Sequence, residues 1–139
     1  MVDGFYWSSF KTVAGLRFKS DIGAEIIGGT PIVDDSTTGV LTVTWPTKSP
    51  QGQIVMKFTE ASLTITATGN IKDKWLLDLT YDKKADLPFT KIEPQKLSYT
   101  FKGANYTVSA QQGTFTNKAV STLQIIPKEN HIVLDLSIR

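Results

Sequence analysis

Cysteine is absent from this 139-residue sequence, and histidine occurs only once. The absence of cysteine excludes disulfide bonds, thiolate catalysis and cysteine-ligated zinc or iron–sulfur sites. The single histidine, His131, is the one imidazole that could serve acid–base catalysis. The sequence is therefore poor in the groups that many catalytic sites use, and we expect it to hold no cofactor.

The chain also lacks a strong charge of either sign and a long apolar run. Its 15 basic and 13 acidic residues give a formal net charge of +2, whereas a nucleic-acid partner requires a concentrated basic face. No run approaches the roughly 18 apolar residues of a membrane-spanning helix. We expect one domain over residues 1–139, with neither nucleic acid nor a membrane span among its partners.

What the sequence does contain is alternation. Apolar residues recur at every second position, which gives a strand one face for a core and one for water, and this pattern is typical of antiparallel sheets. The clearest runs are 53–59, 62–68 and 75–82. Further strands are predicted at 5–10, 16–22, 40–47, 96–102, 106–110, 114–116, 122–126 and 132–138, with 24–32 less regular and 89–92 short.

Nine to eleven short strands with glycine and proline between them predict an all-β fold. A β-sandwich of jelly-roll or immunoglobulin-like topology is the first choice, and a calycin-like antiparallel barrel the second. One competing interpretation is a short helix, because Ile54, Val55, Phe58 and Ala61 also fit a helical face.

Two breaker signals bear on individual strands. Gly28-Gly29 predicts a bulge or a bend where another backbone can come close. Pro46 and Pro50 predict the end of the strand over 40–47.

A weak internal echo links two parts of the chain. Residues 62–70 (SLTITATGN) resemble 122–130 (TLQIIPKEN), and a strand of like pattern follows each, LLDLT at 76–80 and VLDLS at 133–137. The echo suggests two hairpins of one design that pair across a sandwich or barrel, although any two amphipathic hairpins look alike. Two copies are too few for a solenoid.

Candidate catalytic groups are sparse. His131 and Asp135 share a strand face but stand about 13 Å apart along it, which is beyond hydrogen-bond reach. Asp78 and Asp135 occupy matching places in the echo, and a glycosidase would need them about 5–10 Å apart. The turn at 34–39 (DDSTTG) offers oxygen ligands of the kind that calcium takes, but it does not have the spacing of an EF-hand.

Aromatic side chains are the more informative candidates for ligand binding, because Trp and Tyr combine a flat apolar face with a polar tip. Trp7, Trp45 and Trp75 fall in register with core positions, so a place in the core is the competing interpretation for each. Tyr6 is out of register with Trp7 and is the better candidate for an exposed platform. We take these four residues as the candidate ligand-binding site.

Three hypotheses for function remain open. The first is a non-enzymatic binding module for carbohydrate, which rests partly on fold analogy. The second is a β-barrel that encloses a small apolar ligand, as a carrier or as an isomerase or cyclase. The third is a structural or adhesion domain that binds protein, including self-association into a homo-oligomer, through a strand edge or an apolar sheet face.

Overall fold

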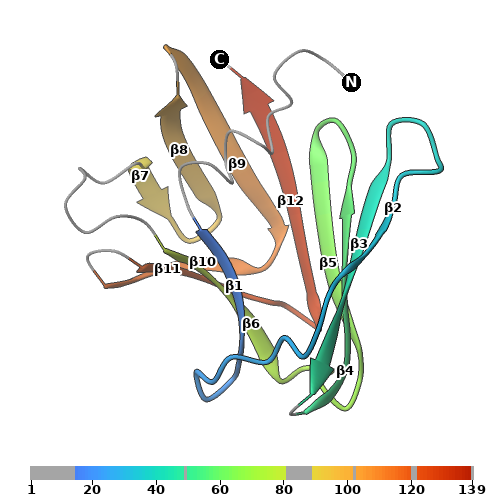
Figure 1. Cartoon of the computed structure of the whole chain (residues 1–139). Helices are drawn as coiled ribbons and strands as arrows, with labels where there is room; N and C mark the ends of the chain where they lie inside the picture. Colours follow the sequence, from blue (N-terminus) through green and yellow to red (C-terminus); the bar gives the residue numbers. More distant parts are fainter. Residues whose placement is uncertain (1–14, 49, 81–88, 102, 120–121, 139) are drawn as a thin grey trace.

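The computed structural model describes residues 15–48, 50–80, 89–101, 103–119 and 122–138, which form two β-sheets. The four-stranded sheet contains, in spatial order, β1 (Gly15–Ser20), β6 (Trp75–Thr80), β11 (Thr122–Ile126) and β10 (Thr114–Ala119). The eight-stranded sheet contains, also in spatial order, β2 (Ile32–Asp34), β3 (Leu41–Lys48), β4 (Gln51–Phe58), β5 (Ser62–Gly69), β12 (His131–Ile138), β9 (Ala104–Gln112), β8 (Lys96–Phe101) and β7 (Phe89–Glu93) (Figure 1).

Every strand pair in both sheets is antiparallel, as the alternating pattern predicted. The two sheets form a β-sandwich, and the prediction of that fold class is confirmed. The described strands do not close into a barrel, so the calycin-like alternative is wrong. Consecutive described strands lie in different sheets five times, at β1–β2, β5–β6, β6–β7, β9–β10 and β11–β12.

The core lies between the sheets, where the apolar side chains of alternate strand positions meet. Burying each such aliphatic side chain contributes about 1.5–3 kcal/mol, which makes this interior the main source of stability. The central strands supply most of it: Phe18, Ile54, Met56, Leu63, Ile65, Trp75, Leu77, Leu79, Leu97, Val108, Phe115, Leu123, Ile125, Ile132, Leu134 and Leu136.

The two echoed units do pair with each other, but neither is a hairpin, because the two strands of each unit lie in different sheets. The first unit is β5 followed by β6, and the second is β11 followed by β12. β5 pairs with β12 in one sheet and β6 with β11 in the other, so each unit contributes one strand to each sheet. Leu63 lies opposite Leu134, and Leu79 lies opposite Leu123. The two units are therefore interleaved at the centre of the sandwich.

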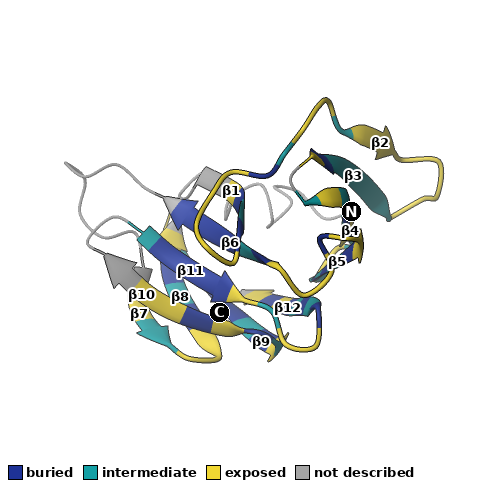
Figure 2. Cartoon of the chain, turned by 90° about the horizontal axis from the view of Figure 1, so that it is seen from below, coloured by how far each residue is buried: buried dark blue, intermediate teal, exposed yellow. Residues whose placement is uncertain are grey.

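Among the described strands, the sandwich is closed along one side and open along the other. β7 and β10, the outer strands of the two sheets, approach each other, and Phe115 N donates a hydrogen bond of 2.7 Å to Pro94 O. At the opposite side β2 and β3 diverge from β1 and β6, as the view along the strands shows (Figure 2). We call β2, β3 and β4 the wing.

The wing tests two sequence-based predictions. The strand predicted at 53–59 is confirmed as β4, and the helical alternative for Ile54 and Phe58 is wrong. Pro46 does not end its strand, because β3 continues to Lys48. The carbonyl oxygen of Pro46 accepts a hydrogen bond from Gly28 N at 2.8 Å. Since the N and O atoms of a strand residue point to the same side, the missing N–H of Pro46 faces this edge and leaves the ladder to β4 complete.

Gly28 allows the close approach that its sequence context predicted. A Cβ atom at this position would lie 2.9 Å from Lys48 Cβ, closer than real Cβ atoms come. The segment around Gly28 can therefore run against the end of β3, where Lys48 N also donates to Ile26 O at 3.2 Å. The edge of β3 is paired with β2 over one half and with this segment over the other.

A stacked tyrosine pair gives the fold a pH dependence. Tyr99 on β8 lies opposite Tyr106 on β9, with ring centroids 4.9 Å apart and planes within 10° of parallel. Burial raises the pKa of Tyr99 above its ordinary value, and the neighbouring Tyr106 phenol adds to the shift. The folded state therefore retains a proton that the unfolded chain loses near pH 10.

We expect the free energy of unfolding to fall as the pH rises above about 10, because the stability from an acid with a raised folded-state pKa is complete below its unfolded pKa and is lost progressively above it. Urea titrations between pH 8 and 11 measure the slope of the free energy of unfolding against pH. In Tyr99→Phe the slope is expected to be shallower than in the wild type. An equal slope in the two proteins would show that Tyr99 does not carry the effect.

Candidate functional site

The best candidate for a functional surface is one face of the wing. On this face the rows of core-facing side chains continue beyond the core. Along one row of the eight-stranded sheet, Ile65 on β5 is fully buried, Met56 on β4 is 3% exposed, Val43 on β3 is half-buried and Val33 on β2 is 59% exposed. Apolar side chains thus become steadily more exposed towards β2. We call the surface formed by Val33, Leu41, Val43 and Trp45 the wing face.

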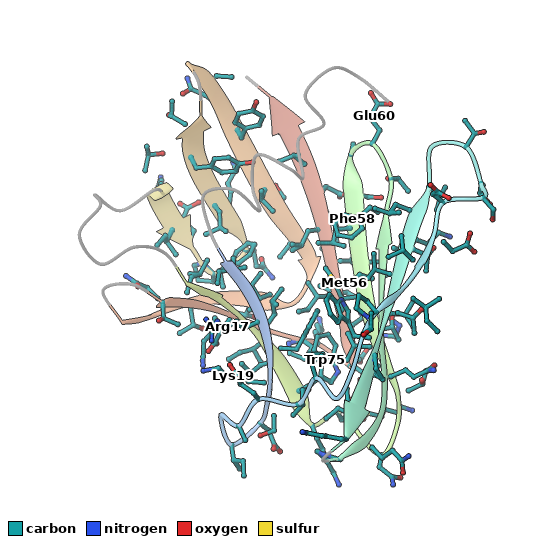
Figure 3. All side chains as sticks on the ribbon, in the orientation of Figure 1. Arg17, Lys19, Met56, Phe58, Glu60 and Trp75 are labelled. Carbon is teal, nitrogen blue, oxygen red and sulfur yellow. The ribbon has the colours of Figure 1, made fainter. Side chains whose placement is uncertain are left out.

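The same row is visible in the side-chain view (Figure 3). Met56 and Phe58 project from β4 towards the space between the sheets, and Trp75 lies below them. Arg17 and Lys19 project from β1 away from this space. The apolar interior therefore continues from the core onto the wing, while β1 turns two charged side chains away from it.

Trp45 is the candidate that the structure leaves on a surface. It lies on β3 opposite Ile54, and its side chain is half-buried on the wing face. Its indole Nε1 is buried and has no hydrogen-bond partner among the described residues. A buried N–H without a partner costs about 1–3 kcal/mol. The wing face therefore carries a large aromatic side chain and an unused hydrogen-bond donor beneath it.

Trp75 is placed differently, although its sequence pattern is the same. It is 2% exposed, it packs against Phe18 with ring centroids 6.3 Å apart, and its Nε1 donates to Asn130 Oδ1 at 2.7 Å. Both its ring and its polar tip are therefore engaged within the fold. Tyr6 and Trp7, the other two candidates, lie outside the described residues.

The remaining aromatic side chains offer no exposed platform in the part of the chain whose burial is described. All of these aromatic residues except Trp45 and Phe58 are buried, and those two are half-buried. The outer face of the eight-stranded sheet instead carries hydroxyl and charged groups, such as Thr42, Thr64 and Asp135. Aromatic and polar groups thus lie on opposite faces of the sheet.

The acid–base candidates are not brought together. Asp78 lies on β6 and Asp135 on β12, strands of different sheets. The Asp78 side chain is 5% exposed, and its Oδ2 lies 3.3 Å from Lys19 Nζ. Asp135 is exposed on the outer face, and His131 Nδ1 lies 2.8 Å from the carbonyl oxygen of Glu129 in its own turn. These groups serve separate local contacts.

The DDSTTG turn uses its first carboxylate internally. Asp34 Oδ1 accepts hydrogen bonds from Ser36 Oγ at 2.6 Å and from Ser36 N at 2.9 Å. The side-chain hydrogen bond, followed by the backbone one, lowers the pKa of Asp34 below its ordinary value. Within the described ranges, no group of three or more His, Cys, Asp or Glu side chains is placed to hold a metal ion.

Sequence analysis did not predict that the apolar side chains of β2 are exposed. Ile32 and Val33 are 68% and 59% exposed, yet the three-residue strand Ile32–Asp34 is too short to show a period of two. The one available signal was two adjacent β-branched aliphatic residues between Pro31 and the polar turn. Without a regular alternation, the sequence does not show which of these two side chains faces the core.

Comparisons of the chain with protein-family models, with curated proteins and with solved structures each found no match. Among the described residues, no helix is long and apolar enough to pass through a bilayer.

Proposed function

We propose that this chain is a non-enzymatic binding domain whose partner is a protein that packs against the wing face. The observation that supports the proposal is the change in burial across one continuous apolar row, from Ile65 at 0% through half-buried Val43 to Val33 at 59%. Contiguous exposed apolar surface at one end of a core is a common feature of protein-interaction sites. Tryptophan, the residue type of Trp45, is also one of the three that are enriched among the residues that anchor such sites.

The same surface gives less support to a carbohydrate ligand. A saccharide needs an aromatic platform with hydrogen-bonding groups beside it, and the neighbours of Trp45 on its face are Val43 and Ile54. The hydroxyl-rich outer face has no exposed aromatic side chain among the residues whose burial is described. A small apolar ligand inside a barrel is not supported either, because the described strands form an open sandwich.

A pair of matched positions tests the proposal. Val33 on the wing face and Ile22 in the turn after β1 are both exposed β-branched residues, at 59% and 88%. A photo-crosslinking amino acid can be placed at position 33 of the full chain in the cells that make this protein. We expect it to give covalent adducts whose added mass is that of another protein. The same group at position 22 is expected to give none.

Equal adducts from the two positions, or none from position 33, would overturn the proposal. A glycan array provides the alternative outcome. Saccharide binding that disappears in Trp45→Ala would assign the wing face to carbohydrate instead of protein.

A further inference from the structure

We draw no further inference here: the strongest candidate, the apolar surface patch that β2 and β3 present around Val33 and Val43, belongs to the site already described, and nothing in the described part of the structure shows which partner covers it.

Discussion

Replacing Asn130 by alanine is expected to lower the free energy of unfolding by about 4 kcal/mol. Asn130 Oδ1 accepts hydrogen bonds from Trp75 Nε1 at 2.7 Å and from Asp73 N at 3.0 Å, and its Nδ2 donates to Ala67 O at 2.7 Å. The substitution leaves buried groups on β5 and β6 without partners, at about 1–3 kcal/mol for each. It also places alanine at a φ of 67°, which costs about 1–2 kcal/mol.

The physical importance of Asn130 is that it joins the two echoed units. It lies in the turn between β11 and β12, whereas its three partners lie on β5, on β6 and in the turn that joins them. The turns of both units change sheet at this place. One amide side chain therefore fixes where each unit leaves the eight-stranded sheet or enters it.

Two neighbouring substitutions separate the side-chain effect from the backbone effect. Lys128 and His131 are joined by a tight turn in which Glu129 and Asn130 both have positive φ, at 51° and 67°. Asn130→Gly relieves the backbone strain at positive φ but loses the three hydrogen bonds, so it should still lower the free energy of unfolding by about 3 kcal/mol. Glu129→Gly relieves the same backbone strain without losing those hydrogen bonds, and it should raise the free energy of unfolding by up to about 1 kcal/mol.

Urea denaturation of the four proteins measures these differences. Changes of opposite sign at adjacent positions with the same backbone conformation are the expected signature of a side-chain clamp. If Asn130→Gly proved as stable as the wild type, the turn would need only its backbone shape, and the clamp would be refuted.

Much of the fold could be predicted because the information was local. A period of two over five to eight residues is enough to predict a strand, and β4, β5, β6, β8 and β12 were found in this way. The assignment of strands to sheets was less accessible. The runs at 53–59, 62–68 and 75–82 look like one continuous unit, yet β6 lies in a different sheet from β4 and β5. Alternation defines an inner face without showing which sheet a strand joins.

The candidate site shows the same division between local and long-range information. Trp45 and Trp75 have equivalent sequence patterns, and both point towards the space between the sheets. Trp75 is buried because it lies on a central strand and meets Phe18 and Asn130. Trp45 remains half-buried because β3 lies near the edge of a sheet that has more strands than the opposite one. That difference depends on strand order, which no short window of sequence contains.

Replacing Gly52 by alanine should be among the most destabilising single changes, at about 3 kcal/mol. Gly52 lies within β4 opposite Gly69, where β5 leaves the sheet. A Cβ atom on Gly52 would overlap the carbonyl oxygen of Thr68 and lie 2.9 Å from Ile71 Cγ2. Ile71 is fully buried in the turn after β5. The missing side chain of Gly52 therefore leaves the space in which this turn folds over the end of the core.

The cost is expected to be steric, since overfilling a packed site typically costs 1–3 kcal/mol. Gly39→Ala is the matched control. Its Cβ would meet nothing within 4 Å, but its φ of +78° penalises alanine, so only a backbone cost of about 1 kcal/mol is expected there. Gly52 carries no such backbone penalty, because its φ is not positive. Urea denaturation of both variants decides the matter. If Gly52→Ala cost no more than Gly39→Ala, the close approach of β4 to the Ile71 turn would not be a constraint on the fold.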